Sequence, residues 1–445
     1  MGLRASLEIV GEDVVPENFD KFRQRVPMEW VEQALELTGT ASIRKRRLPA
    51  TQATWVVLAM GLFRNLSIDE VVRQCDLALP ASGRPVAKSA IHQARTRLGP
   101  EPIRWLFERS ARAWSDEQAK HNTWRGLSVY GIDGTTLRVA DTKDNREHFG
   151  GADGGPRGAS GYPMLRLVVL LCLRARVIAA ASFGEYGQGE WSYTMPLMDS
   201  IPDNSLTIVD RNFLGASLLL TIASKRNGHF LIRAKKSTKW RVVSRLGTKD
   251  ALVEMEVSGV ARKKDPTLPK VWRARAIHYQ RPGFPPNYLL TSLLDPQMYP
   301  AQDVVNMYHE RWEIELAYDE IKTHLMEAEE TLRSKSPAAV KQELWGVLLS
   351  YNLVRIEMAR TANQLDLPAT RISFVLSVNL IRQQCSGGPV IFTPGNIPKR
   401  LRQLRLELAR FILPPRRART YPRAVKIKMS SYPRKRPKLQ PKTAN

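Results

Sequence analysis

The spacing of hydrophobic residues changes along this chain, and the change separates a helical part from a strand-rich part. Up to about residue 120, apolar residues recur with helical spacing in the stretches 17–37, 51–65, 67–77 and 88–98. Ser67 is suited to cap the third of these helices, and the segment 80–85, rich in proline and glycine, separates it from the fourth. We therefore predict an all-helical N-terminal domain over residues 1–120.

From Trp124 onward the pattern becomes that of β-strands. Residues 127–139 predict either a β-hairpin or one long bent strand, and this stretch carries Asp133. A short β-rich run at 205–210 ends in Asp210. Other strands are predicted within 164–183 and at 229–233, with helices at 191–200 and 215–225. Strands that alternate with helices favour an α/β layer.

Residues 234–290 lose the helical rhythm, because hydrophobic and charged residues alternate there, as in 253–257 and 271–277. This alternation predicts an antiparallel β insertion. A strand at 288–292, a long helix at 308–322 and a second helix at 337–364 follow. The sequence thus predicts an α/β domain over 121–365 with a β insertion at about 234–290, and then a C-terminal helical segment over 366–413.

The charge of the chain narrows the choice of partner. The 445 residues carry a formal charge of +25, while 43% hydrophobic and 25% charged residues are typical of a soluble globular protein. Such an excess of cations predicts a polyanionic partner, either nucleic acid or an anionic membrane. Residues 414–445 contain many Lys and Arg and no Asp or Glu, which predicts a disordered basic tail.

Several classes of protein are disfavoured. The first 20 residues have no apolar core flanked by basic residues, so we expect no signal peptide. The most apolar run, 164–183, contains three arginines and therefore predicts buried strands, not a membrane span. The three cysteines are far apart and no Cys/His cluster has zinc spacing, which favours reduced thiols in a cytoplasmic protein. The glycine-rich stretch 150–158 lacks a Walker pattern and is interpreted as a mobile loop facing substrate.

The helix predicted at 308–322 concentrates charged residues on one face. On a helical wheel, an arc of roughly 60° contains four residues that could serve one site, Tyr308, Arg311, Glu315 and Lys322. Asp319 joins this arc, whereas the glutamates at 310, 313 and 320 point away. The same residues also fit a solvated helix with ion pairs along it, and the stretch alone leaves the two interpretations about equal.

Two distant aspartates change that balance. Asp133, Asp210 and Glu315 fall on three different predicted elements. Oxygen ligands from separate rigid elements suit Mg²⁺ or Mn²⁺, and two such ions about 4 Å apart can activate a water or a 3′-hydroxyl for phosphodiester chemistry. On spacing alone, either aspartate taken singly fits an ordinary strand-end carboxylate slightly better.

The order of these residues resembles a known family. Tyr308, Arg311, Glu315 and Lys322 match the Tyr-x2-Arg-x3-Glu-x6-Lys signature of the insertion-sequence-four family of DDE transposases, which are bacterial cut-and-paste enzymes. Residues 132–136 and 208–213 resemble the blocks around that family's two catalytic aspartates, and 44–49 is similar to part of its N-terminal domain. The resemblance covers most of the chain up to about residue 365.

The resemblance implies a ribonuclease-H-like catalytic core over 121–365, interrupted by the β insertion, behind a helical DNA-binding domain. It implies that Asp133, Asp210 and Glu315 bind Mg²⁺ or Mn²⁺, as two ions, and that Tyr308, Arg311 and Lys322 contact phosphates near the cut. Related enzymes hold a flipped base with an aromatic residue just before this helix. The candidates here are Tyr288 and Trp312, and either ring could instead belong to the hydrophobic core.

The stretch 88–98 offers a second set of candidate contacts. Its side chains suit base edges and phosphates, as in the recognition helix of a helix-turn-helix, and Arg95 and Arg97 are the predicted DNA-binding residues. An ordinary surface helix explains the same stretch equally well.

The resemblance and the charge together lead to a functional hypothesis. We predict a DNA transposase that binds the terminal inverted repeats of an insertion sequence, cuts them with Mg²⁺ and joins them to a target. We expect it to act as a homodimer on DNA, in the cytoplasm and associated with the nucleoid, without contact to a membrane. The alternatives are a nuclease on the same fold without strand transfer, and a domesticated, non-catalytic DNA-binding protein. All three catalytic positions hold acids, which disfavours the last alternative.

Overall fold

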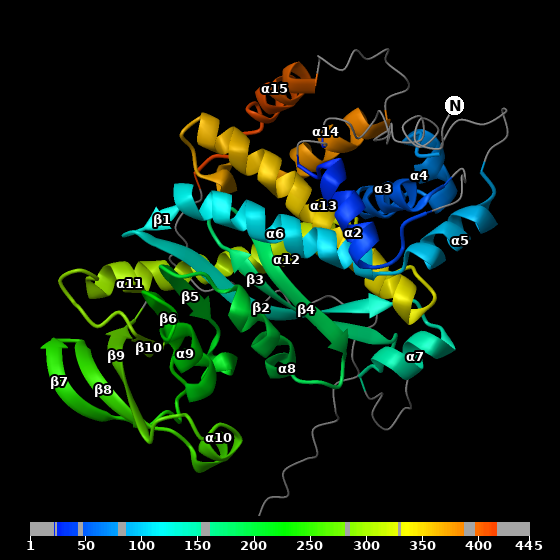
Figure 1. Ribbon diagram of the computed structural model, residues 1–445. Coiled ribbons are helices and arrows are strands. Elements are labelled where there is room, and N and C mark those ends of the chain that lie inside the picture. Colours follow the sequence, from blue (N-terminus) through cyan, green and yellow to red (C-terminus); the bar gives the residue numbers. More distant parts are fainter. Residues whose placement is uncertain are drawn as a thin grey trace, which may run out of the picture.

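One large mixed sheet runs through the protein, and helices pack against it in the computed structural model (Figure 1). The structure describes residues 22, 25–42, 48–78, 86–152, 161–280, 285–327, 331–386 and 397–415. The main path of the sheet is β4-β3-β2-β5-β6-β10-β9-β8-β7. The first five strands along this path are β4 (Val177–Glu185), β3 (Met164–Cys172), β2 (Leu127–Val139), β5 (Ser205–Val209) and β6 (Gly228–Arg233).

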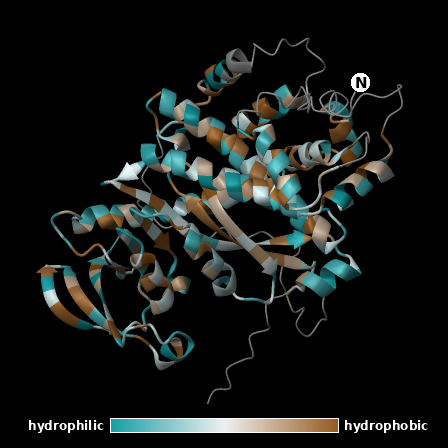
Figure 2. Ribbon diagram, viewed as in Figure 1, coloured by the Kyte–Doolittle hydropathy of each residue, from teal (hydrophilic) through white to brown (hydrophobic). Residues whose placement is uncertain are grey.

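These five strands form the apolar centre of the molecule. β2 pairs antiparallel with β3, which pairs antiparallel with β4, while β2, β5 and β6 are parallel to one another. β2 is a single long strand, so the hairpin alternative for 127–139 is wrong and the long strand is confirmed. The central strands are largely hydrophobic, whereas the outer helices carry many hydrophilic residues (Figure 2). The predicted mixed α/β fold is confirmed.

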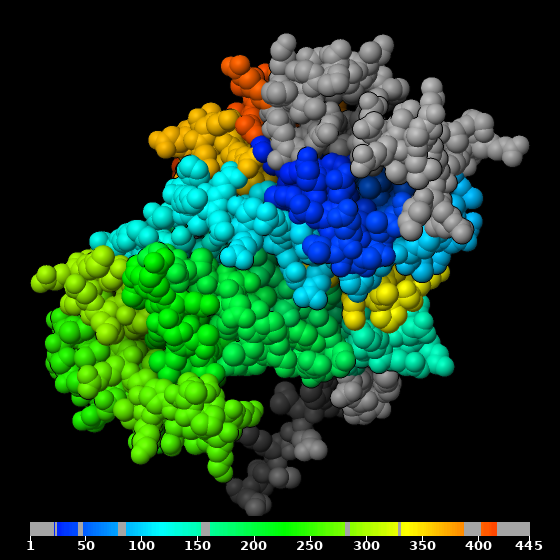
Figure 3. Space-filling model, in the orientation of Figure 1, coloured from blue at the N-terminus to red at the C-terminus, as the bar shows by residue number. Residues whose placement is uncertain are grey.

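The predicted antiparallel strands of 234–290 continue this same sheet. They are β7 (Arg241–Gly247), β8 (Asp250–Glu256), β9 (Val271–Tyr279) and β10 (Asn287–Thr291), with the short helix α10 (Gly259–Lys264) between β8 and β9. β10 joins them to β6, and every pairing from β6 outward is antiparallel. In the space-filling view these strands and α10 project as a lobe at the lower left (Figure 3).

The four helices predicted before residue 120 are present. α2 (Met28–Leu37), α3 (Ala50–Leu62) and α4 (Ile68–Gln74) are shorter than predicted, while α5 (Lys88–Leu98) has the predicted bounds. A further helix that was not predicted, α6 (Glu101–His121), follows them. Ser67 precedes α4 and forms a capping box with Glu70, as its position predicted. Almost every residue of α3 is buried, because other helices surround it (Figure 1).

The long helix α13 (Pro337–Gln364) has the predicted bounds and packs against helices from both the N-terminal and the C-terminal part of the chain. It crosses α3 closely, since a Cβ on Gly61 would lie 2.7 Å from the carbonyl oxygen of Gly346. Buried ion pairs tie Arg64 to Glu343 and Arg25 to Glu357. The C-terminal helices α14 (Phe374–Ser386) and α15 (Ile397–Leu408) also pack on α13. Helices from before and after the sheet therefore share one core.

The remaining sequence predictions concern the apolar run, the cysteines and the segments between or beyond the elements. The run 164–183 folds as β3 and β4, and none of the helices in the described ranges is long and apolar enough to cross a membrane. The cysteines are buried, as predicted. Most of the glycine-rich stretch 150–158 and nearly all of the basic segment 414–445 lie outside the described residues. The helix predicted at 191–200 divides into α8 (Glu190–Thr194) and a 3-10 helix (Met195–Ser200).

Candidate active site

The two aspartates are neighbours because of the register of two parallel strands. Ile132 of β2 lies opposite Val209 of β5, and the residue that follows each of them is an aspartate. Asp133 and Asp210 are therefore side by side at the point where β5 ends. The Oδ1 of Asp133 accepts a hydrogen bond of 2.8 Å from the Gly134 N–H, and the Asp210 carboxylate is close enough to act electrostatically on Asp133.

The segment 308–322 is helical throughout but changes pitch three times. α11 (Ala301–Tyr308) passes through a 3-10 turn (His309–Arg311) into α12 (Trp312–Asp319), and a π-helical segment (Glu320–Leu325) follows. A π turn holds more residues than an α turn, so the wheel arithmetic fails beyond Asp319. The prediction of one regular α-helix is wrong in this respect, although the residues do face a common site.

Helix α12 and the π-helical segment after it are fixed against β2 by three contacts. Gly131 of β2 allows a close approach, because a Cβ there would lie 2.6 Å from the Ile314 side chain. The buried Tyr318 hydroxyl donates to the Asp133 carbonyl oxygen at 2.7 Å. The Lys322 ammonium donates to the Thr135 hydroxyl, also at 2.7 Å. Together these contacts set the position of the helix relative to Asp133.

Arg311 lies among the three predicted acids. Its guanidinium donates to Glu315 at 2.9 Å and lies 3.6 Å from Asp133, and it also interacts electrostatically with Asp210. The Asp319 carboxylate instead accepts a bond from Thr323 and lies near His324. The structure therefore separates Glu315 from Asp319, which the helical wheel could not do.

Comparisons with known proteins identify the family. Residues 16–108 match the family model described as the insertion element 4 transposase N-terminal, and residues 124–353 match the transposase DDE domain. The second match contains the three acids and covers more than half of the chain. The chain belongs to the IS4 family of DDE transposases.

Two relatives from Escherichia coli strain K12 have similar sequences. The transposase InsG for insertion sequence element IS4 is 35% identical over 411 residues, 91% of each chain. The putative transposase InsZ is 34% identical over 225 residues, 50% of this chain and 74% of InsZ. A piggyBac transposase synaptic complex with hairpin DNA superposes with a TM-score of 0.40 at 12% identity, covering 90% of this chain and 86% of its own, which supports no conclusion. The predicted family, DNA transposase function and DDE enzyme class are confirmed.

Members of the DDE domain family use divalent metal ions, and the donor set of this transposase suits them. Asp133, Asp210 and Glu315 offer carboxylate oxygens only, as hard cations prefer. In the described part of the chain, however, no three acidic, histidine or cysteine side chains are close enough together to hold an ion. Two of the three acids are instead paired with one cation, since the Arg311 guanidinium lies 2.9 Å from Glu315 and 3.6 Å from Asp133.

Burial shifts the acidity of two groups in the site. Burial of the Asp133 carboxylate, with repulsion from Asp210 and Glu190, raises its pKa to about 6 against the opposing effects of the Gly134 N–H and Arg311. Burial also raises the pKa of Tyr308 to about 12, so its phenol keeps its proton at neutral pH and can donate a hydrogen bond.

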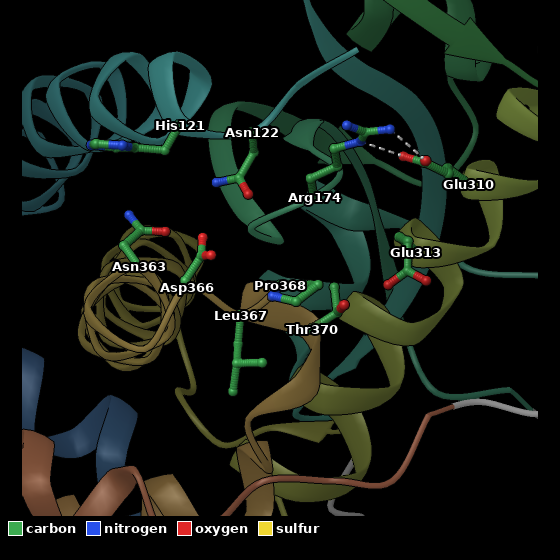
Figure 4. A pocket seen from close by; sticks show the side chains of 10 residues that line it. All are labelled: His121, Asn122, Arg174, Glu310, Glu313, Asn363, Asp366, Leu367, Pro368 and Thr370. Atoms are coloured by element: carbon green, nitrogen blue, oxygen red, sulfur yellow. Dashed lines mark hydrogen bonds and ion pairs between the residues drawn. The ribbon is translucent and has the colours of Figure 1, made fainter.

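The glutamates that point away from the site, at 310, 313 and 320, form ion pairs on the opposite face of the helical segment. Glu310 pairs with Arg174, and these two residues face an open cavity of about 610 Å³ (Figure 4). Arg176 donates to Glu313 at 2.7 Å and pairs with the buried Glu320. The helical wheel placed these glutamates on the back face, but no pattern in the sequence pointed to the two arginines, which come from the turn between β3 and β4.

The residues predicted to contact DNA differ in how exposed their side chains are. Arg95 is a wrong prediction, because its guanidinium is buried and donates to Gln342 at 2.9 Å and Ser334 at 3.2 Å. Arg97 is exposed on α5. Trp312 is 54% exposed and Tyr288 is 42% exposed, so neither ring belongs to the core. Tyr288 packs edge-on against two other rings of the insertion, those of Trp240 and His278.

Asp133→Asn is expected to stabilise the metal-free transposase at neutral pH. Folding raises the pKa of Asp133 from its ordinary value of 3.8 to about 6. The contribution of this group to the free energy of unfolding is therefore fully present below pH 3.8 and is lost as the pH rises through about 6. The interval corresponds to roughly 3 kcal/mol as an upper limit. An asparagine cannot ionise, so the free energy of unfolding at pH 7.5 should rise by about 1–3 kcal/mol, with little change at pH 4.

Urea unfolding with EDTA, followed by circular dichroism, measures this effect. Asp319→Asn is the matched control, because Asp319 is an exposed acid of the same site region and should change stability little. A loss of stability at pH 7.5 in Asp133→Asn would show that the carboxylate is not strained by burial.

Proposed function

We propose that this transposase cuts the terminal inverted repeats of its element and joins them to target DNA, using ions held by Asp133, Asp210 and Glu315. The observation that carries the proposal is that Arg311 pairs with Asp133 of β2 and Glu315 of α12 and interacts electrostatically with Asp210, which follows β5 beside Asp133. Two ions are proposed, Mg²⁺ or Mn²⁺. When bound, they would activate the attacking oxygen and stabilise the leaving oxygen.

The order of the five central strands supports a ribonuclease-H-like core. Three antiparallel strands, β4, β3 and β2, are followed across the sheet by β5 and β6, both parallel to β2. The first acid lies in the central strand β2, and the second follows β5. We propose accordingly a catalytic domain over 121–365 with its insertion at about 234–290, between a DNA-binding domain at 1–120 and helices at 366–413.

Side chains of the transposase would bind the DNA on both sides of the reacting phosphate. Arg311, Lys322 and the protonated phenol of Tyr308 can donate to phosphate oxygens. In the first step a water attacks the phosphodiester and the 3′ oxygen leaves as a hydroxyl. In the second step that hydroxyl loses its proton and attacks a phosphodiester of the target, and the target's own 3′ oxygen leaves and takes up a proton. Tyr288 or Trp312, both exposed, would stack on a flipped base, and Arg97 would contact the end DNA.

Joining two ends requires two active sites, so we propose a homodimer on DNA, acting at the nucleoid. The test is incubation of the full chain and Mg²⁺ with a duplex that carries an end of the element and with a target plasmid. Cleavage followed by joining supports the proposal. Cleavage without joining indicates a nuclease, and binding without cleavage indicates a domesticated DNA-binding protein.

Removal of residues 414–445 is expected to weaken DNA binding without regard to sequence. The segment carries its Lys and Arg residues without any acid, and the slope of log K against log salt should fall by about 0.9 for each phosphate that the shortened chain no longer neutralises. Gel-shift titrations at several salt concentrations measure this slope for end DNA and for unrelated DNA. A weakening confined to end DNA, with the slope unchanged, would contradict a purely electrostatic role.

A further inference from the structure

Arg311 is paired with two of the three carboxylates that are proposed to bind metal. Its Nη2 lies 2.9 Å from a Glu315 oxygen and its Nη1 lies 3.6 Å from an Asp133 oxygen, while the side chain is only 13% exposed. Burial opposes the charge of Arg311, but the electrostatic effects of Tyr308 and of the three acids, Glu315, Asp133 and Asp210, outweigh burial and raise the pKa of its guanidinium. The guanidinium thus compensates the negative charge that a divalent ion would otherwise neutralise.

A guanidinium cannot make way for a metal ion by losing its proton, since arginine stays charged in proteins. An ion that enters between Asp133 and Glu315 must displace the hydrogen bond from Arg311 and would then repel that residue at short range. The side chain therefore has to move for the ion to bind. Lys322 differs, because its ammonium is directed to the Thr135 hydroxyl of β2.

We propose that Arg311 is a placeholder cation that keeps divalent ions out of the active site until a DNA phosphate draws it away. This inference rests on the proposed function, in which these acids bind metal. It adds an order of events, in which DNA binds first and the metal ions bind afterwards. The DNA-free protein then has no metal-loaded active site.

The surroundings of Arg311 provide the exit. The residue lies in the 3-10 turn before α12, and its guanidinium is already 5.4 Å from the centre of the exposed Trp312 ring. The exposed face of that ring would offer the cation a partner once it leaves Glu315 and Asp133. A phosphate oxygen pair suits the planar fork of arginine better than it suits an ammonium, so docked DNA can compete for Arg311.

The proposal requires coupling between two ligands. If DNA removes Arg311 from the carboxylates, DNA raises the affinity for metal, and metal must raise the affinity for DNA by the same factor. In the free protein the metal affinity of Arg311→Met should exceed that of the wild type by about tenfold or more, within the usual range of such couplings. Arg311→Lys keeps the charge and should remain close to the wild type.

The experiment measures Mn²⁺ binding to the full-length, DNA-free protein by electron paramagnetic resonance. Lys322→Met is the matched control, since it removes one positive charge from the same site. Circular dichroism checks folding. The expected result is a tenfold or larger gain in Arg311→Met, no comparable gain in Lys322→Met or Arg311→Lys, and loss of the gained binding when Glu315→Gln is added.

Three outcomes overturn the inference. Equal gains in Arg311→Met and Lys322→Met would mean that only net charge matters. Equal binding by the wild type and Arg311→Met, abolished in both by Glu315→Gln, would refute the placeholder and leave the proposed metal site standing. If Mn²⁺ binding to Arg311→Met is insensitive to Glu315→Gln, the proposed metal site itself fails, and the placeholder with it.

A second measurement tests the coupling from the side of DNA. Binding of an end-carrying duplex is titrated with and without Ca²⁺, which replaces Mg²⁺ to keep the DNA intact. The wild type should bind DNA several-fold more tightly with Ca²⁺, and Arg311→Met should show a smaller ratio even though its DNA affinity is lower. An unchanged ratio in the variant would overturn the proposal.

Discussion

Glu315→Gln is expected to eliminate metal-dependent strand cleavage, with a loss of several orders of magnitude in rate, whereas Asp319→Asn should cost at most about tenfold, or roughly 1.4 kcal/mol in the barrier. The two acids are one turn apart on α12, and both lie on the face that the helical wheel assigned to the site. Their surroundings differ. Glu315 shares Arg311 with Asp133, while Asp319 accepts a hydrogen bond from Thr323 and lies near His324.

Single-turnover cleavage of a pre-bound terminal repeat gives both rates without interference from product release. Circular dichroism confirms that the variants fold, which is expected because both side chains are substantially exposed, Glu315 at 40% and Asp319 at 56%. An inactive Asp319→Asn beside an active Glu315→Gln would refute the assignment of the third acid. The roles proposed for Tyr308, Arg311 and Lys322 would then fail as well, because they depend on the same register.

Asp210→Asn is the second change with a large expected effect, and it separates catalysis from binding. It removes a proposed metal ligand without adding bulk, so cleavage should fall by several orders of magnitude while end binding changes by less than about threefold. Asp210 follows the last residue of β5 and lies beside Asp133. Gel-shift titration and single-turnover cleavage on the same protein preparation measure the two effects.

Asp199→Asn is the matched control for Asp210→Asn, since it removes one negative charge from an exposed position in the same domain. Both variants reduce repulsion of DNA to a similar extent, so any shared change in affinity reports on net charge alone. Only Asp210→Asn should lose cleavage. A parallel loss of end binding in Asp210→Asn, absent from Asp199→Asn, would mean that Asp210 supports the DNA-binding surface and not the chemistry.

The sequence determined the elements and the chemical class of the site. Short runs of β-forming apolar residues located β5 and β6. Alternation of apolar and polar residues located the antiparallel strands of the insertion, because a half-buried strand imposes a period of two on its own residues. The apolar stripe of α13 gave its bounds for the corresponding reason in a helix. The acids and the Tyr-Arg-Glu-Lys spacing identified the family, since catalytic residue types at fixed spacing are a local property of the chain.

Tertiary structure alone decided which charged groups meet. Arg95 has the composition of a DNA contact, yet the packing of α5 places it on Gln342 and Ser334, about 240 residues away in the chain. Arg176 pairs with Glu313 and Glu320, which are 137 and 144 residues away in the chain. Arg311 pairs with Asp133 of the neighbouring strand. A helical wheel fixes the face on which a side chain lies, but burial and the partner on the neighbouring element determine its role, because a charge removed from water must find its compensation there.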